Sequence, residues 1–72
     1  MAELTPAQQL GRRIRAARAG RGWSMRQVAV KARVSIMTVQ RIEHGREIAY
    51  SSAVQIAAAL DIPLDGARGA TP

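Results

Sequence analysis

The segment SMRQVAVKARVSIMTVQRIEHG, residues 24–45, determines the fold. Ser24 opens a Ser-x-x-Gln capping box, in which side-chain and backbone groups satisfy each other, and this predicts a helix over residues 25–32. Ser35 is a further N-cap candidate and predicts a helix over residues 36–44, which a glycine then ends. The segment is therefore predicted to form two short helices separated by a tight turn.

Side-chain sizes in this segment fit two helices that cross closely. Ala29 is small at the point where the second helix has to approach the first. Val34 is an apolar residue in the turn and can fill the corner between the helices. Val39 and Ile42 recur at helical spacing and are expected to pack back onto the first helix. These features predict a helix-turn-helix arrangement.

The second helix of this pair has two chemically different faces. At about 100° per residue, Thr38, Val39 and Ile42 point towards the core, and Ile36 lies at the edge between the faces. The outer face carries Met37, Gln40, Arg41 and His44. Amides and guanidiniums can pair with the edges of adenine and guanine, and an α-helix fits the major groove of DNA. The alternative is the solvent-facing side of an ordinary helix, on which Gln and Arg are common.

One helix is predicted before this pair and another after it. Residues 5–8, TPAQ, combine a capping box with proline at the first helical position and predict a helix to about Ala19. A fourth helix is expected over residues 50–60, although Ser52 offers an alternative start; its expected packing residues are Val54, Ile56, Ala57 and Leu60. A further helical turn is expected near Pro63. The predicted fold class is all-α, a compact bundle of four to five helices.

Length and composition limit the possible architecture and location. A chain of 72 residues holds one domain at most, here expected as an N-terminal tail over 1–5, a folded domain over 6–65 and a flexible tail over 66–72. Without cysteine, and with His44 as the single histidine, we expect no disulfide, no metal site and no cofactor. No apolar run approaches the ~18 residues of a membrane span, and the N-terminus lacks a signal-peptide pattern. A cytoplasmic location without a membrane partner is therefore expected.

The sequence offers no catalytic constellation. It contains no cysteine and no histidine pair, its five acidic residues are scattered, and its serines occupy predicted helix caps. No glycine-rich phosphate loop follows a strand, because no strand is predicted. An enzyme is therefore not expected.

Charge is distributed unevenly along the chain. The formal net charge is +6, and residues 11–46 contain ten basic residues and one acidic residue, for a net charge of +9. The remainder of the chain has a net charge of −3. Such an asymmetry favours a polyanionic partner such as nucleic acid. The alternative is a solvated basic surface without a partner.

Several segments together match a known family pattern: LGRRIRAAR at residues 10–18, WSMRQVA at 23–29, Val34-Ser35, VQRIEHG at 39–45 and IAAALDI at 56–62. The most specific is the Val-Ser…Ile-Glu-x-Gly pattern between Val34 and Gly45. In these residues the sequence resembles the phage repressor and Cro family, the Xre-type helix-turn-helix regulators. The resemblance implies a lambda-repressor-like DNA-binding fold. It also implies a sequence-specific transcriptional regulator, expected to be a repressor, that binds double-stranded operator DNA as a homodimer.

The resemblance also implies roles for individual residues. The helix over residues 36–44 would be the recognition helix, and its base-reading positions would be Ile36, Met37, Gln40 and Arg41. Phosphate contacts are implied at Ser24, Met25 and Arg46. A buried ion pair between Arg18 and Glu43 is implied as a structural contact, and Glu43 is the only acidic residue between Gly11 and Arg46.

Two positions depart from the family pattern. Arg33 occupies the place between the two helices that is usually glycine, because the backbone there tends to be left-handed. A residue with a side chain costs about 1 kcal/mol or more at such a position, and the Arg33 side chain is expected to reach a phosphate in return. Ile36 and Met37 are apolar, which favours contact with thymine methyl groups over hydrogen bonding to bases.

The sequence leaves two other functions open. One is an antitoxin, whose protein partner is a toxin and whose DNA binding regulates its own promoter. The other is a non-specific basic module for nucleic acid or an anionic membrane, for which Arg12, Arg13 and Arg15 form a basic side of one helix. A dimer surface is expected near Tyr50, Val54, Ile62 and Leu64, unless these residues only complete the core of the monomer.

Overall fold

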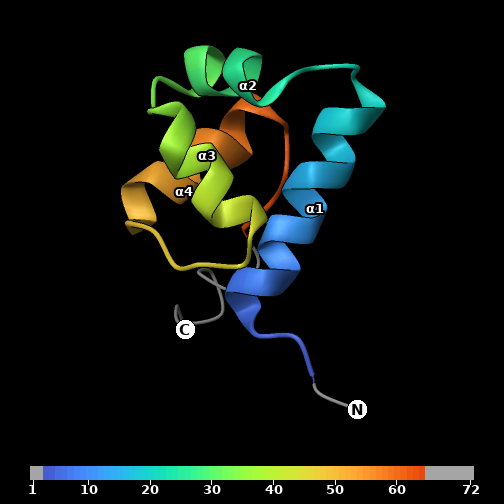
Figure 1. Ribbon diagram of the computed structural model, residues 1–72, viewed down its shortest axis with the longest axis vertical. Coiled ribbons are helices and arrows are strands. Elements are labelled where there is room, and N and C mark those ends of the chain that lie inside the picture. Colours follow the sequence, from blue (N-terminus) through green and yellow to red (C-terminus); the bar gives the residue numbers. More distant parts are fainter. Residues whose placement is uncertain (1–2, 65–72) are drawn as a thin grey trace.

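A computed structural model of the chain describes residues 3–64 and contains four helices within that range (Figure 1). They are α1 (Pro6–Gly20), α2 (Met25–Ala32), α3 (Ile36–Glu43) and α4 (Tyr50–Ala59). The predicted all-α class is confirmed. Residues 62–64 have no regular secondary structure, and the further helical turn expected to open near Pro63 would continue into residues outside the described range. The tail expected over residues 66–72 lies outside the described residues.

The first three helices begin where the sequence predicts, because side chains cap them. The Thr5 hydroxyl accepts a hydrogen bond from the Gln8 N–H at 3.1 Å, while the Gln8 carboxamide oxygen accepts from the Thr5 N–H at 2.9 Å. Ser24 forms the same capping box at the start of α2. Ser35 caps α3 by accepting from the Thr38 N–H at 3.1 Å. Each cap satisfies N–H groups that the helix itself leaves without partners.

α4 lacks such a cap. Its N-cap residue is Ala49, which makes no side-chain cap hydrogen bond. The alternative start at Ser52 is wrong, because the helix already begins at Tyr50. Apolar packing rather than capping therefore fixes the beginning of α4.

All four helices end in the same way. A residue with positive φ follows each helix: Gly22 (69°), Arg33 (60°), Gly45 (79°) and Asp61 (57°). After α2, the Val34 N–H donates to the Ala29 carbonyl at 3.0 Å and the Arg33 N–H donates to the Val30 carbonyl at 3.2 Å. These two bonds form a Schellman motif, and equivalent pairs follow the other three helices. The left-handed backbone expected at Arg33 is confirmed.

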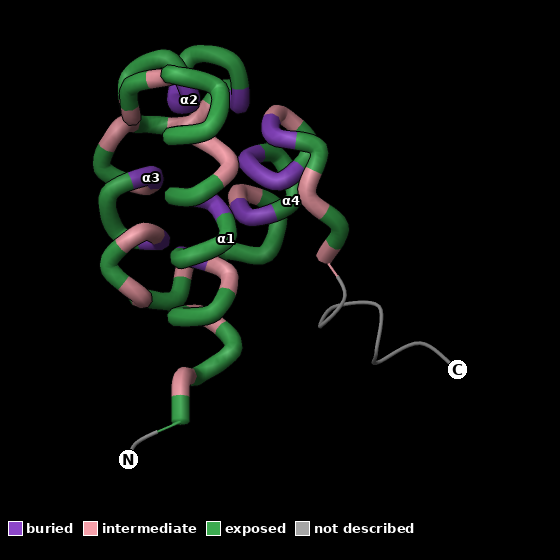
Figure 2. The backbone as a smooth tube through the Cα atoms, turned by 90° about the vertical axis from the view of Figure 1, so that its right-hand side faces the viewer, coloured by how far each residue is buried: buried purple, intermediate pink, exposed green. Residues whose placement is uncertain are grey.

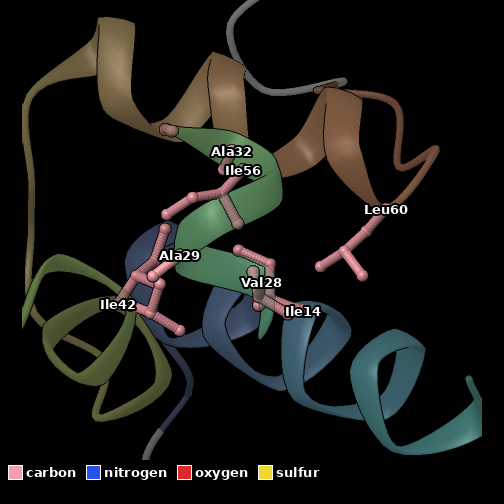
Figure 3. Close-up of a cluster of buried hydrophobic side chains, with 9 residues drawn as sticks. Ile14, Val28, Ala29, Ala32, Ile42, Ile56 and Leu60 are labelled. Carbon is pink, nitrogen blue, oxygen red and sulfur yellow. The ribbon is translucent and has the colours of Figure 1, made fainter. Parts of the chain in front are cut away.

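The core is a cluster of aliphatic side chains from all four helices (Figure 3). Its largest fully buried members are Ile14, Val28, Val39, Ile42, Ile56 and Leu60. Val54 was expected to pack here, but it is 38% exposed, and Ala53 is buried instead. Val54 precedes the buried Ile56 by two residues, or about 200° around the helix, so both side chains cannot face the core.

A glycine inside α1 allows the close approach of α3. Gly11 is buried, and a Cβ at this position would overlap the backbone carbonyl oxygen of Ile42 near the end of α3. Glycine in a helix interior costs about 0.5–1 kcal/mol relative to alanine. The missing side chain is therefore what lets the two backbones touch, and this contact holds α3 against α1.

α3 and α4 lie on different sides of the molecule. α3 lies in front of α4 in Figure 1, and a quarter turn separates them to either side of α1 (Figure 2). Within residues 3–64, no helix is long and apolar enough to cross a membrane.

Candidate nucleic-acid interface

α2 and α3 form the predicted helix-turn-helix. Ala29 is buried where the two helices cross, and Val34 in the turn is half-buried against the core. On α3, Val39 and Ile42 are buried, so the helix is fixed in its rotation about its own axis. Its opposite side therefore faces away from the core.

The exposed side of α3 carries the side chains expected from the helical wheel: Met37, Gln40, Arg41 and His44. Met37 is 55% exposed, although it is a large apolar residue. Ile36 differs from the other implied base-reading residues, because it is half-buried and packs against the core. Only part of the Ile36 side chain is thus accessible to a partner.

His44 occupies the C-terminal end of the exposed side. Its Nδ1 lies 2.7 Å from the carbonyl oxygen of Gln40. A carbonyl oxygen only accepts hydrogen bonds, so Nδ1 carries the proton, and Nε2 remains available to a partner. His44 is thus a further polar group on this surface, beside the four residues to which the family resemblance assigns base reading.

The N-terminus of α2 offers two backbone donors. The Ser24 N–H donates to the Gln27 carboxamide oxygen at 2.7 Å, and the Ser24 hydroxyl accepts from the Gln27 N–H. Among residues 3–64, no acceptor is found for the N–H groups of Met25 and Arg26. Met25 itself is half-buried and packs on the core, so its backbone N–H rather than its thioether is accessible to a ligand. An anion would be bound by these N–H groups and the helix dipole.

Arg18 and Glu43 form an ion pair that links α1 to the end of α3. The Arg18 Nε and Nη2 donate to the two carboxylate oxygens of Glu43 at 2.7 and 2.9 Å. The third guanidinium nitrogen donates to the carbonyl of Trp23 at 3.1 Å. The Glu43 side chain is only 3% exposed. The hydrogen bond to Glu43 raises the pKa of Arg18, burial opposes that rise, and the charge of Glu43 adds to it.

Three other basic residues contact their own chain, which the sequence did not reveal. Arg13 donates to the carbonyl of Pro63 at 3.1 Å, and Arg21 donates to the carbonyl of Leu60 at 2.9 Å. The Lys31 ammonium lies 4.7 Å from the centroid of the Trp23 ring. The hydrogen-bond acceptors are backbone carbonyls distant in sequence, which no residue type indicates. Four of the ten basic residues of the 11–46 segment, Arg18 included, therefore make contacts within the chain.

The remaining basic residues of the 11–46 segment are exposed: Arg12, Arg15, Arg26, Arg33, Arg41 and Arg46. Within the described part of the chain, their side chains have no hydrogen bond or ion pair. Arg33 ends α2 and precedes α3, while Arg46 follows α3, so two of these cations lie at the two ends of the exposed helix. Glu47 lines a small hollow together with Arg41, and it is the nearest exposed acidic residue to this surface along the chain, since Glu43 is paired with Arg18.

The comparisons with known proteins agree with this geometry. A helix-turn-helix family model matches residues 14–66, which is more than half of the chain. No match was found among curated proteins or among solved structures. The matched family is one of DNA-binding regulators rather than of enzymes. The chain belongs to the Xre-type, lambda-repressor-like helix-turn-helix family and is a DNA-binding transcription regulator.

Proposed function

We propose that the protein is a sequence-specific transcriptional repressor that binds double-stranded operator DNA as a homodimer, with α3 in the major groove. One observation carries this proposal: α3 buries Val39 and Ile42 completely and exposes a side with an amide, a guanidinium and a thioether. A helix of this size fits the major groove, where these groups meet the edges of base pairs.

Base recognition is assigned to three exposed side chains of α3. The Gln40 carboxamide can pair with adenine and the Arg41 guanidinium with guanine, while Met37 can contact a thymine methyl group. Ile36 contributes only its exposed part to this apolar contact. The Nε2 of His44 offers a fourth polar contact at the C-terminal end of the helix.

Phosphate contacts would fix the position of α3 on the duplex. The N–H groups of Met25 and Arg26 suit one phosphate, and the hydroxyl hydrogen of Ser24 can supply a further bond. Arg33 and Arg46 are exposed cations on either side of α3. Contacts of this kind set affinity and register but do not distinguish bases.

A homodimer follows from the small number of base pairs that one helix reads. Two copies related by a two-fold axis would bind half-sites about 34 Å apart, one helical turn of DNA. Occupancy of an operator that overlaps a promoter is sufficient to exclude polymerase. Repression therefore requires only the DNA interface described above.

The proposal is tested by selecting binding sites from a random duplex library and measuring affinity for the selected and a scrambled site at several salt concentrations. We expect a preference of about 10³-fold or more for the selected site. We also expect log K to fall by about 0.9 per contacted phosphate for each tenfold increase in salt. Equal affinity for the two duplexes would contradict sequence-specific binding.

Arg41→Ala separates base reading from phosphate binding. The variant is expected to lose about 1–3 kcal/mol of discrimination at one base pair of the site. Arg46→Ala is the matched control, because loss of a phosphate contact weakens binding to all sequences about equally. Unchanged base preference in Arg41→Ala would remove Arg41 from the reading surface. A reporter with the selected site across its promoter distinguishes repression from activation by the sign of the response.

A further inference from the structure

His44 is the single histidine of the chain, and the chain contains no cysteine. Histidine is the side chain that ordinarily changes its charge between about pH 5.5 and pH 8, whereas carboxylates, lysine, arginine and tyrosine keep theirs in this range. His44 is exposed and directly follows α3, the helix that the proposed function places in the major groove. A change of side-chain charge on this surface near neutral pH therefore arises at His44.

The imidazole ring of His44 is held at the end of α3 by a hydrogen bond. Its Nδ1 lies 2.7 Å from the carbonyl oxygen of Gln40, which also accepts from the backbone N–H of His44 at 3.0 Å. Nδ1 donates this bond in the neutral ring and in the protonated ring alike. Nε2, in contrast, is an acceptor in the neutral ring and a donor in the protonated one. Protonation therefore reverses the hydrogen-bonding role of Nε2 and keeps the bond that orients the ring.

The position of His44 along α3 points to a phosphate as the partner of Nε2. In helix-turn-helix complexes, the N-terminal residues of the recognition helix contact base edges. Met37 occupies that end of α3, and His44 follows seven residues later, about 10 Å along the helix axis. Arg46, which is proposed to bind a phosphate, comes two residues after His44. A phosphate oxygen only accepts hydrogen bonds, so it pairs with Nε2 in the protonated ring alone.

We infer that DNA binding by this protein is coupled to protonation of His44, whose Nε2–H donates to a phosphate of the duplex. The inference rests on the proposed function and adds regulation of the same interface by pH. A phosphate attracts the imidazolium and repels the lone pair of the neutral Nε2, so the bound duplex favours the protonated ring. Binding then takes up a proton. By linkage, the affinity for DNA rises as the pH falls through the titration of His44 and is lost again as the pH increases.

The other charged groups around the end of α3 do not produce this effect. The titratable and charged groups on the surrounding elements are Arg41 and Glu43 of α3, Arg15 and Arg18 of α1, Arg46 and Glu47 of the following loop, Arg26 and Lys31 of α2, and Tyr50 of α4. Glu43 is bound by Arg18, and α4 carries no charged residue. Carboxylates, arginine, lysine and tyrosine ordinarily keep their charge between about pH 5.5 and pH 8. What differs between the free and the bound protein is therefore the phosphate beside His44.

The test measures the affinity of the full chain for the selected and the scrambled duplex at about pH 5.5 and about pH 8, at several salt concentrations. We expect binding to be about three- to tenfold tighter at the lower pH for each bound copy. The gain should appear on both duplexes, because a phosphate contact does not distinguish bases. At the lower pH, the salt slope should also be steeper by about 0.9 for each bound copy.

Two substitutions fix the charge at this position. His44→Gln is neutral at every pH and should lose the gain on acidification. His44→Lys is positively charged throughout and should bind more tightly than His44→Gln at both pH values, without the pH dependence. Arg46→Gln is the matched control, because it removes a permanent cation of the same loop and keeps the histidine. It should weaken binding at both pH values and retain the wild-type ratio between them. Circular dichroism should show all three variants folded.

Nuclear magnetic resonance follows the protonation of His44 directly, because the chain has one imidazole ring. The midpoint of the ring titration should lie at higher pH in the DNA complex than in the free protein. By linkage, the difference in pH units for each copy equals the logarithm of the gain in affinity. An unchanged midpoint would overturn the inference. So would weaker binding on acidification, which would show that the neutral Nε2 accepts a hydrogen bond from a base.

The two duplexes distinguish failure of this inference from failure of the proposed function. If the wild type binds both duplexes equally, yet more tightly at low pH and only with His44 present, sequence-specific binding is wrong and the coupling to His44 stands. If the selected duplex is preferred but the wild type and His44→Gln have the same pH dependence, the proposed function stands and the role of His44 is wrong.

Discussion

α3 and α4 each bury one side in the same core and expose the other, yet the exposed sides carry different chemistry. α3 exposes Gln40 and Arg41, whose polar atoms suit base edges. α4 exposes Tyr50 and Val54 and carries no charge at all. The buried sides do not distinguish the two helices, because the buried residues of both are apolar. The exposed sides do, since one suits a polyanion and the other an apolar surface.

The two helices are also held in place differently. α3 is fixed by a backbone contact with Gly11 and by the ion pair between Arg18 and Glu43. The buried side chains of α4 are apolar, and among the described residues a single side-chain hydrogen bond, from Gln55 Nε2 to the Ala32 carbonyl at 3.1 Å, joins it to another helix. A recognition helix has to present its side chains in one defined orientation, and directional contacts achieve this better than apolar packing alone.

Arg18→Ala should have the largest effect. It leaves the buried carboxylate of Glu43 without its partner, and breaking a buried pair in this way costs about 3–5 kcal/mol. In a domain of this size, each kcal/mol lowers Tm by about 4–8 °C. Because the folded protein raises the pKa of Arg18, the contribution of the pair is complete below the usual guanidinium pKa and is lost only as the pH rises through the raised value.

Arg15→Ala is the control for this measurement. Arg15 is an exposed arginine on the same helix, and its removal should change the free energy of unfolding by no more than about 0.5 kcal/mol. Thermal unfolding followed by circular dichroism measures both variants. Equal Tm values for Arg18→Ala and Arg15→Ala would show that the ion pair does not hold α3.

Gly11→Ala should have the next largest effect. A methyl group at this position meets the backbone of Ile42, so α1 and α3 have to move apart, at a cost of about 1–3 kcal/mol. Gly20→Ala is the matched control, because no atom lies within 4 Å of a Cβ built there. Alanine in that helical position should stabilise the protein by up to about 1 kcal/mol. If both variants were stabilised, the close contact would not constrain α3.

The helices could be predicted from sequence wherever side chains set their ends. Thr5, Ser24 and Ser35 act through hydrogen bonds to residues three positions away, so the sequence contains both partners. The same locality explains why the exposed side of α3 could be predicted. The start of α4 at Tyr50 agrees with the expected range, but the sequence could not decide between it and Ser52, because Ala49 makes no side-chain cap bond.

Most contacts between residues far apart in the sequence could not be predicted from the sequence. The family resemblance implied the pair of Arg18 with Glu43. Independent support came from the charge pattern, because Glu43 is the one acidic residue between Gly11 and Arg46. Nothing indicated that Arg13 and Arg21 donate to backbone carbonyls near the end of the described chain. The steric role of Gly11 was equally hidden, because it depends on how near α3 comes.

The smallest effect is expected at Arg33, where stability and DNA binding should change in opposite directions. Arg33 has φ of 60° at the end of α2, in the same motif that Gly45 completes after α3. Arg33→Gly relieves this strain and should stabilise the protein by about 1 kcal/mol, less what the more flexible unfolded chain gains. Loss of the cation should weaken binding to selected and scrambled duplexes alike and reduce the salt slope by about 0.9. Arg33→Lys keeps the charge and should keep the slope. If Arg33→Gly left the salt slope unchanged, Arg33 would have only a structural role in the turn, and other residues would make the phosphate contacts.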